Sequence, residues 1–402
     1  MKSIFKKMII ALSAIAWGTL SVYAQNVNMN RYIVLNVKEG ADILLDICAD
    51  ADNTSIKIVS GNNERIITVG TKWVGRQNYS AGAGTMTIYG NVQQFDCGGN
   101  AANITGLNAS NNTQLQELYC YLNSIASIDI KSNTQLKGLG CFSNSLTSID
   151  VSNNTQLKLL DCSANSISSI DVSHNPQLEQ LWIFDNSLTS LDLSNNTKLT
   201  RLNCCNNSLT SIDVSHNPQL EWLYCFENSL ATLDISRNKN LNYLACYGNK
   251  FSTAVLDEIY CSLPDRKDKS SGVIRPLLNE QSSEKAKVLA TNGSNVISKN
   301  WKVKYYAVNS DITGFTGMHQ CGGTDVEEVK DTPAVLSVYP NPVSDILYIT
   351  TDKPAHNIRV YNVYGQEVAQ ATDADSINVA NLPSGVYIVN ADGKIARIIK
   401  EQ

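Results

Sequence analysis

The feature that most constrains the fold is a repeat of constant length between Leu115 and Phe251. Its consensus is L-x-x-L-x-C-x-x-N-x-(I/L)-x-x-(I/L)-D-(V/I/L). The first leucine recurs every 21 residues, at Leu115, Leu136, Leu157, Leu178, Leu199, Leu220 and Leu241. Units of this size bury their apolar side only against neighbouring units, so the constant period predicts a solenoid.

Each unit divides into a strand, a turn and a return path. The L-x-x-L-x-C segment predicts a short strand in which Leu and Cys alternate inward. The asparagine that follows keeps the same register, at Asn123, Asn144, Asn165, Asn186, Asn207, Asn228 and Asn249. We expect its side chain to satisfy buried backbone donors of neighbouring turns. A period of 21 residues leaves no room for a full helix in the return path, which should be extended or made of single turns.

Six of the eleven cysteines occupy one repeat position, which Ile183 fills in the remaining unit: Cys120, Cys141, Cys162, Cys204, Cys225 and Cys246. The isoleucine indicates an apolar, inward-facing position. Stacked strands lie about 4.8 Å apart, whereas a disulfide needs Cβ atoms roughly 3.5–4.5 Å apart. We therefore predict a ladder of buried free thiols that begins at Cys97. Four cysteines lie outside it, and a bridge between the last two is left open: Cys48, Cys205, Cys261 and Cys321.

The pattern L-x-x-L-x-C-x-x-N resembles the leucine-rich repeat, with cysteine in place of a strand leucine. The 21-residue form with a cysteine ladder is similar to the repeats of internalin-J-like bacterial surface proteins. This resemblance covers about residues 92–251, including a degenerate first unit at 92–100. It implies a leucine-rich-repeat solenoid with parallel strands on its concave face, little helix and β-rich caps. It says little about the ligand.

The segments beside the repeats read as an export signal and caps. Residues 1–24 have the lysine-rich start, apolar run and small residues of a signal peptide cleaved between Ala24 and Gln25. Residues 25–91 contain short β-rich runs and are interpreted as an N-terminal cap, with a small independent binding domain as the alternative.

The segments after the repeats read as a second cap and a linker. Residues 252–313 are interpreted as a C-terminal cap that opens with a short helix from Ser252-Thr253 to Leu263, ended by Pro264. Residues 314–334 are rich in Gly, Thr and acidic residues and are interpreted as a linker.

Residues 335–402 predict a separate Ig-like β-sandwich, because apolar residues alternate between turn signals. Three motifs in this segment resemble the C-terminal sorting domain of the type IX secretion system of Bacteroidetes such as Porphyromonas. They contain Tyr339, Pro340, Asn341 and Pro342, then Gly365, then Gly385 and Tyr387. The resemblance implies passage across the outer membrane of a Gram-negative bacterium. It also implies removal of this domain and attachment of the mature protein to the cell surface.

The sequence contains none of the common catalytic or nucleotide-binding motifs. His174 and His216 occupy equivalent turns and are interpreted as repeat decoration. A net charge of −5 gives no basic footprint for nucleic acid. We therefore predict a protein that is not an enzyme, with no catalytic residue and no cofactor.

A column of aspartates accompanies the repeat, at Asp129, Asp150, Asp171, Asp192, Asp213 and Asp234. We expect each carboxylate to accept a backbone N–H in its own turn. A row of Ca²⁺ sites is the alternative, but no Ca²⁺-loop spacing is present and no metal site is assigned.

The outward strand positions vary between units and are rich in aromatic residues, although alternation points them away from the core. The candidate partner-binding residues are Tyr119, Tyr121, Phe142, Trp182, Phe184, Trp222, Tyr224, Phe226, Tyr243 and Tyr247. Strand propensity could favour aromatic residues here, and an intramolecular cap could cover some of them. We predict a surface adhesin that docks a protein partner on this face, with a glycan ligand as the alternative.

Overall fold

The computed structural model describes residues 26–321, 336–350, 355–362, 366–392 and 394–401. The chain forms two compact units, Met1–Gly322 and Gly323–Gln402. Three residues of the sequence predictions, Ala24, Gln25 and Gly365, lie outside the described residues. Within the described residues, no helix has the length and apolar character needed to span a bilayer.

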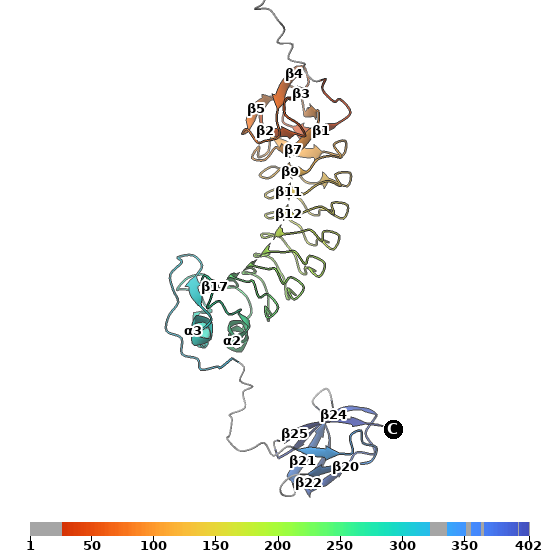
Figure 1. The fold of residues 1–402 in the computed structure, drawn as a ribbon, viewed down its shortest axis with the longest axis vertical. Coiled ribbons are helices and arrows are strands. Elements are labelled where there is room, and N and C mark those ends of the chain that lie inside the picture. Colours follow the sequence, from red (N-terminus) through yellow and green to blue (C-terminus); the bar gives the residue numbers. More distant parts are fainter. Residues whose placement is uncertain (1–25, 322–335, 351–354, 363–365, 393, 402) are drawn as a thin grey trace, which may run out of the picture. The chain divides into compact units, whose positions relative to one another are not determined.

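The repeats form a solenoid whose strands stack into one sheet (Figure 1). Corresponding residues of successive units pair in parallel, as Leu118 with Leu139 and Leu139 with Leu160. The strands are β7 (Val92–Asp96), β9 (Glu117–Tyr119), β11 (Gly138–Gly140), β12 (Leu159–Asp161), β13 (Gln180–Trp182), β14 (Arg201–Asn203), β15 (Trp222–Tyr224) and β16 (Tyr243–Ala245). The predicted solenoid with its 21-residue period is confirmed, and β7 of the degenerate unit pairs with β9 in the same sense.

Each regular repeat strand is followed, three residues after its end, by a left-handed residue that stands two positions after the inward cysteine or its equivalent. The backbone φ is 49–52° in six units and 63° at Gly248. The six are Leu122, Ser143, Ala164, Asp185, Asn206 and Glu227. This conformation is rare for residues other than Gly, Asn and Asp, so the neighbouring structure must stabilise it.

The asparagine that follows this turn supplies such stabilisation. The Nδ2 of Asn144 donates to the backbone oxygens of Cys120 and Cys141 at 2.9 and 3.0 Å, and its Oδ1 accepts the N–H of Ile125 at 3.0 Å. The same pattern recurs through Asn249. The predicted bonding of asparagine to backbone donors of a neighbouring turn is therefore confirmed.

A second asparagine column, which the sequence analysis did not single out, lies in the polar turn that precedes each strand. Its members are fully buried: Asn112, Asn133, Asn154, Asn175, Asn196, Asn217 and Asn238. From Asn133 on, each Nδ2 donates to two backbone oxygens of the preceding unit; Asn196 bonds Val172 and Asn175, both at 3.0 Å. This column joins the polar turns of adjacent units.

The cysteine ladder is buried and unbridged, as predicted. Cys97 and the six repeat cysteines are at most 1% exposed and free. The return path contains no helix, and only one short strand occurs there, β10 (Ile128–Asp129). The aspartate column also behaves as expected, since Asp192 and its equivalents accept the backbone N–H two residues on, at 2.8–3.1 Å.

The N-terminal flank is a two-sheet structure that continues into the repeats. Its strands are β1 (Tyr32–Val37), β2 (Asp42–Ala49), β3 (Thr54–Ser60), β4 (Asn63–Val69), β5 (Gln77–Ser80), β6 (Thr85–Tyr89) and β8 (Ile104–Asn108). One sheet has the order β10-β8-β1-β6-β3-β4, while β2 and β5 extend the repeat sheet beyond β7. Because β2 pairs with β7, the first parallel strand has no free edge on this side.

The C-terminal flank mixes helices with strands and is less β-rich than expected. It contains α2 (Thr253–Ser262), β17 (Gly272–Leu277), α3 (Lys285–Leu289), α4 (Ser294–Ile297) and β18 (Trp301–Tyr305). The two strands extend the repeat sheet in parallel. The predicted helix α2 is confirmed, with the Ser252 hydroxyl accepting the N–H of Val255 at 3.2 Å.

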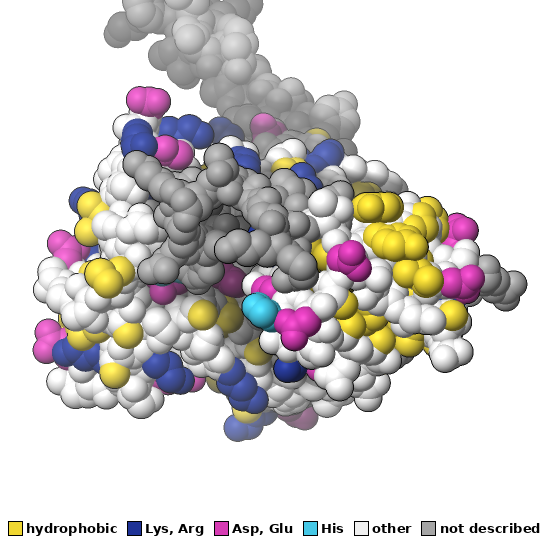
Figure 2. All heavy atoms as spheres, turned by 90° about the horizontal axis from the view of Figure 1, so that it is seen from below, with side chains coloured by type: hydrophobic (Ala, Val, Ile, Leu, Met, Phe, Trp, Pro, Cys, Tyr) yellow, Lys and Arg dark blue, Asp and Glu magenta, His cyan; other side chains and the backbone are white. Residues whose placement is uncertain are grey.

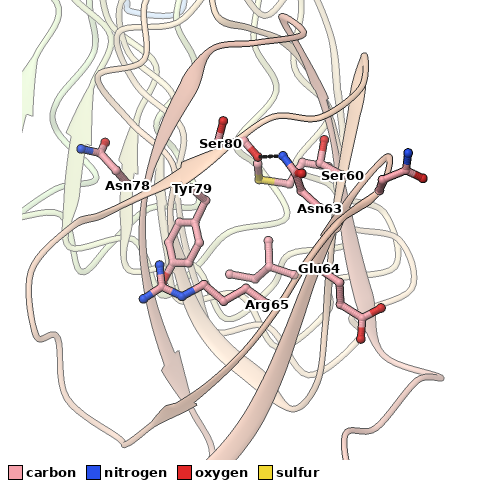
Figure 3. A pocket seen from close by; sticks show the side chains of 10 residues that line it. Ser60, Asn63, Glu64, Arg65, Asn78, Tyr79 and Ser80 are labelled. Atoms are coloured by element: carbon pink, nitrogen blue, oxygen red, sulfur yellow. Dashed lines mark hydrogen bonds between the residues drawn. The ribbon is translucent and has the colours of Figure 1, made fainter.

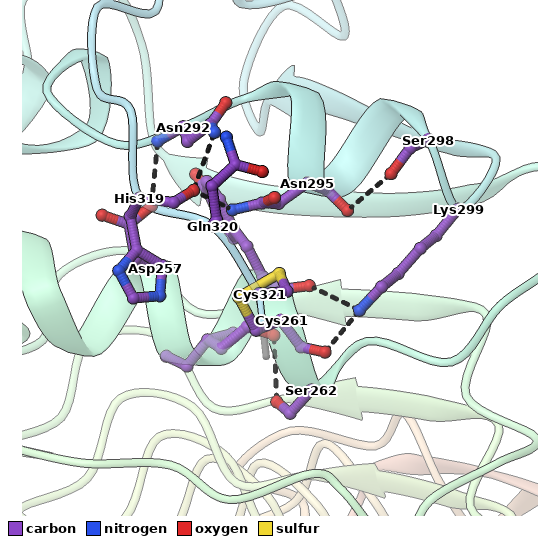
Figure 4. The surroundings of a disulfide bond; sticks show 12 residues. Asp257, Cys261, Ser262, Asn292, Asn295, Ser298, Lys299, His319, Gln320 and Cys321 are labelled. Atoms are coloured by element: carbon purple, nitrogen blue, oxygen red, sulfur yellow. Dashed lines mark hydrogen bonds between the residues drawn. A yellow bond between two sulfur atoms is a disulfide. The ribbon is translucent and has the colours of Figure 1, made fainter. Parts of the chain in front are cut away.

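A disulfide between Cys261 and Cys321 holds residues 314–321 against this flank (Figure 4). The backbone oxygen of His319 accepts the Nδ2 groups of Asn292 and Asn295 at 2.7 and 2.8 Å. Residues 314–321, which the sequence analysis assigned to the linker, are therefore packed on the first unit.

The second unit consists of a three-stranded and a four-stranded antiparallel sheet around one apolar core, consistent with the predicted β-sandwich. Its strands are β19 (Ser337–Tyr339), β20 (Ile346–Thr350), β21 (Ala355–Tyr361), β22 (Glu367–Ala374), β23 (Ser376–Asn378), β24 (Gly385–Ala391) and β25 (Lys394–Lys400). Several motif residues have structural contacts, and the ring of Tyr339 stacks on that of Tyr348 with the centroids 5.6 Å apart. Asn341 accepts the N–H of Ile399 at 2.8 Å, and the Tyr387 hydroxyl donates to the oxygen of Pro383 at 2.8 Å.

Candidate functional site on the concave face

The ten candidate aromatic residues occupy three rows that cross the repeat sheet. Strand pairing sets two rows in register: Glu117, Gly138, Leu159, Gln180, Arg201, Trp222, Tyr243; and Tyr119, Gly140, Asp161, Trp182, Asn203, Tyr224, Ala245. A third row follows the inward cysteine position: Tyr121, Phe142, Ser163, Phe184, Cys205, Phe226, Tyr247. Ring contacts divide the candidates into groups at the two ends of the face.

The group near the N-terminal flank is covered by residues from the loop before β5. The rings of Tyr121 and Phe142 stack with their centroids 4.6 Å apart. The Arg76 guanidinium lies 5.1 Å from the Tyr121 centroid and forms an ion pair with Asp96 at 2.9 Å. Trp73 of the same loop lies 6.2 Å from Tyr119, so both tyrosines of this group have an intramolecular partner.

The group near the C-terminal flank is partly closed by Tyr306. Phe226 and Tyr247 stack at 4.5 Å, and Tyr306 lies 5.0 and 5.1 Å from their centroids. These two candidate rings are only 7% and 6% exposed. The expectation that they face solvent is therefore wrong, because the C-terminal flank packs over them.

Three further candidates form a half-buried cluster between that covered pair and the centre of the face. Trp222 and Tyr243 stack with centroids 5.7 Å apart, and Tyr224 lies 4.8 Å from Tyr243. The Arg201 guanidinium lies 4.8 Å from the Trp222 centroid. Burial raises the pKa of both tyrosine hydroxyls, so both stay protonated at neutral pH.

The centre of the face holds Trp182 and Phe184 beside Asp161, all half-buried. No ring–ring contact of Trp182 occurs within the described residues. The Asp161 carboxylate accepts the hydroxyl and N–H of Ser163 at 2.6 and 3.1 Å, while burial raises its pKa. Phe184 packs against the apolar cluster that contains Phe226 and Tyr247. Among the described residues, no ring contact or hydrogen bond joins the Trp182 side chain to either flank.

Sequence reasoning missed four residues that shape this face: Trp73, Arg76, Arg275 and Tyr306. All four lie in the flanks, outside the repeat pattern that identified the other candidates. A tryptophan in the short polar loop Thr71–Arg76 was the available signal for the first two. For Arg275 the signal was absent, because the 21-residue period ends before β17 extends the sheet.

A pocket of about 480 Å³ lies away from the repeats, in the N-terminal flank (Figure 3). Its wall includes Asn63, whose Nδ2 donates to the oxygen of Ser80 at 3.2 Å, and Arg65, which lies over the Tyr79 ring at 5.2 Å. Elsewhere, the surface shown in Figure 2 carries Lys and Arg side chains interspersed with Asp and Glu. None of the sequence-predicted candidates lines this pocket.

Solved structures similar to the chain include several leucine-rich-repeat proteins. Internalin J of Listeria monocytogenes, whose functional domain includes a cysteine ladder, is 19% identical over 80% of this chain and 94% of its own, with a TM-score of 0.32. A leucine-rich-repeat protein of Leptospira interrogans is 21% identical over 49% of this chain and 56% of its own, with a TM-score of 0.35.

Internalin F of L. monocytogenes is 24% identical over 38% of this chain, with a TM-score of 0.36. The present chain spans about half (48%) of that structure's length. No curated protein matches the sequence. Residues 337–401 match the family described as secretion system C-terminal sorting domain, so the second unit carries a sorting domain for export to the cell surface.

Proposed function

We propose that this protein is a non-catalytic adhesin that binds a protein partner through the concave face of its repeats. Export would begin with cleavage of the signal peptide between Ala24 and Gln25 and continue by the type IX route. The sorting domain matched at residues 337–401 supports that route. Removal of this domain and anchoring at the outer membrane complete the proposal.

The observation that carries the proposed binding function is the set of partly exposed aromatic side chains that extends from Trp182 at the centre of the face to Trp222. Packing against the flanks explains why aromatic residues stand where the flanks cover the face. Packing in the core explains the inward leucines. Neither explains Trp182 and Trp222, which stay partly exposed on the outward rows. Large, rigid rings of this kind supply much of the binding energy at protein interfaces.

Replacing Trp182 and Tyr224 together by alanine tests the proposal with little disturbance of the core. The labelled full chain is measured for binding to host cells and to cells of neighbouring bacteria. We expect the double variant to lose at least about 10-fold in affinity, as for a truncated interface hot spot. Tyr348→Ala is the matched control, because Tyr348 is an exposed aromatic residue of the second unit. Unchanged binding by the double variant would exclude the concave face.

A glycan ligand is the second candidate, favoured by the stacked pair of Trp222 and Tyr243, since flat rings also pack against sugar faces. Treating the cells with protease or with glycosidases before the assay separates the two. Loss of binding after protease alone supports a protein partner, whereas loss after glycosidase treatment supports a glycan.

A further inference from the structure

Two arginines lie beside the Trp222–Tyr243 pair. Arg201, on β14, pairs in register with Trp222 and has its guanidinium 4.8 Å from that ring's centroid. Arg275, on β17, has its guanidinium 5.5 Å from the Tyr243 centroid and 5.7 Å from that of Tyr306. The two cations and the rings therefore lie across β14, β15, β16 and β17.

Neither arginine has an anionic partner among the described residues. Arg76 on the same face, in contrast, is neutralised by Asp96 at 2.9 Å. The Nη1 of Arg275 donates to the oxygens of Tyr305 and Tyr306 at 2.6 and 3.2 Å, and its Nη2 donates to the Asn309 Oδ1 at 2.6 Å. Its buried Nε has no acceptor within the part of the chain that the structure describes. A half-buried guanidinium held only by neutral oxygens is incompletely compensated, so an added anion would stabilise it.

The two guanidinium groups act on a common region of the face. Both lower the pKa of the Tyr224 hydroxyl, against the larger effect of burial, which raises it. Acidic groups on the repeat rows, Glu117 and Asp161, lie towards the N-terminal side, on β9 and β12. On the strand rows themselves, the charged residues of β14–β17 are the cations Arg201 and Arg275. The carboxylates of Asp185 and Glu227 lie beside the third row, where they act on Cys205 and Tyr247.

We propose that this cationic aromatic half of the face binds an extended acidic peptide segment of the partner protein. The inference rests on the proposed function and specifies the partner's chemistry. The Arg201 guanidinium has no side-chain hydrogen bond among the described residues, so its planar fork can take a carboxylate. Arg275, whose Nη1 already donates to two backbone oxygens, attracts the second carboxylate by its charge. An aromatic or apolar side chain packs on the Trp222–Tyr243 pair.

The spacing of the strands selects an alternating pattern of partner residues. From β14 to β17 there are three strand spacings, or roughly 14 Å. In an extended peptide, side chains at i, i+2 and i+4 lie on one side and span about 13–14 Å. A segment with acid, aromatic and acid at these positions therefore places one carboxylate near each arginine and the ring between them.

The test uses a fluorescein-labelled peptide that repeats Glu-Ser-Tyr-Ser and a counterpart with Gln in place of Glu. Binding to the full chain is followed by fluorescence anisotropy at 50 and 500 mM NaCl. We expect the Glu peptide to bind at least about 10-fold more tightly than the Gln peptide at low salt, and the difference to shrink at high salt. Arg201→Gln and Arg275→Gln should each weaken the Glu peptide by at least about 5-fold.

Arg65→Gln is the matched control. Its guanidinium also lies over a tyrosine ring, that of Tyr79 at 5.2 Å, and has no ion pair among the described residues, but it belongs to the N-terminal flank. This variant should bind the Glu peptide as the wild type does. Because Arg275 also bonds to the C-terminal flank, thermal unfolding of Arg275→Gln is measured in parallel. If Arg275→Gln proves unstable, Arg201→Gln still tests the inference, because the Arg201 side chain makes no hydrogen bond to the C-terminal flank.

Equal affinity for the Glu and Gln peptides, absence of binding by both, or an equal loss in Arg65→Gln would overturn the inference. If both peptides bind equally and the Trp182/Tyr224 double variant weakens both, the acidic preference fails while the proposed function stands. If the double variant leaves peptide and cell binding unchanged, both proposals fail. If sialyllactose binds and the Glu peptide does not, the proposed acidic peptide is wrong and an acidic glycan is the ligand.

Discussion

The ring of Tyr119 lies across Gly140 of the next strand. A Cβ atom built on Gly140 would lie 2.7 Å from the Cδ1 of Tyr119, closer than real Cβ contacts. A Cβ on Gly138 would lie 3.2 Å from the Tyr119 hydroxyl, which is tight but not prohibitive. Two glycines in one strand, unique among the repeats, thus allow a neighbouring aromatic side chain to lie flat on the sheet.

This contact predicts a graded response to alanine. Gly140→Ala should displace the Tyr119 ring and destabilise the protein by about 1–3 kcal/mol, the usual cost of inserting a carbon into a packed site. Gly138→Ala should cost less, because its neighbour is the far end of the tyrosine. Urea unfolding measures both changes. Adding Tyr119→Ala should remove most of the cost of Gly140→Ala, and a cost that persists in the double variant would refute the contact.

The second asparagine column predicts a contrast between two adjacent residues. Asn196→Ala should destabilise the protein by about 1–3 kcal/mol, because two buried backbone oxygens lose their donor. Asn195 is exposed and makes one bond, to the oxygen of Ser173 at 3.1 Å. Asn195→Ala should therefore change the free energy of unfolding by less than about 0.5 kcal/mol. Similar losses in the two variants, measured by urea unfolding, would refute the structural role of the column.

Those two asparagines also show where sequence reasoning stops. Both stand in the same polar turn, and composition alone does not distinguish the buried amide from the exposed one. The asparagine that follows each strand, such as Asn165, was predictable because it stands at a fixed place after the leucine–cysteine pattern. The turn asparagine also repeats, but its neighbours in sequence are polar and give no sign of burial.

The concave face was predictable in outline from side-chain alternation, which placed Trp182 and Trp222 on the outward rows. Its coverage was not, because it depends on residues distant in the sequence. Tyr306 reaches Phe226 and Tyr247 only after the chain has passed through α2, β17 and β18. Trp73 reaches Tyr119 from the opposite flank. Non-periodic segments carry no register from which such contacts could be read.

The buried thiols should not react with thiol reagents in the folded protein. Burial raises the pKa of Cys120, Cys204 and Cys246 to about 12, so almost no reactive thiolate is present at pH 8. We expect none of the nine free cysteines to react with Ellman's reagent in the native state and all nine to react in 6 M guanidinium chloride. Rapid native labelling of any ladder cysteine would contradict the inward position of that column.

The aspartate turns predict an acid-sensitive contribution to stability. The Ser152 hydroxyl and N–H, at 2.6 and 3.0 Å, lower the pKa of Asp150 below its usual range. A lowered folded-state pKa stabilises the protein above the pKa of the unfolded chain, and that stabilisation is lost as the pH falls through the lowered value. The loss should therefore begin below about pH 4.

Replacing Ser152 by alanine removes the larger of these two causes. The pKa of Asp150, followed by ¹³C NMR of its carboxyl carbon, should move towards its usual value but stay below it, because the N–H of residue 152 still donates. Asp192, whose pKa is lowered first by the backbone N–H of Ser194, provides the internal control and should titrate as in the wild type. An unchanged pKa of Asp150 would show that the hydroxyl does not stabilise the carboxylate.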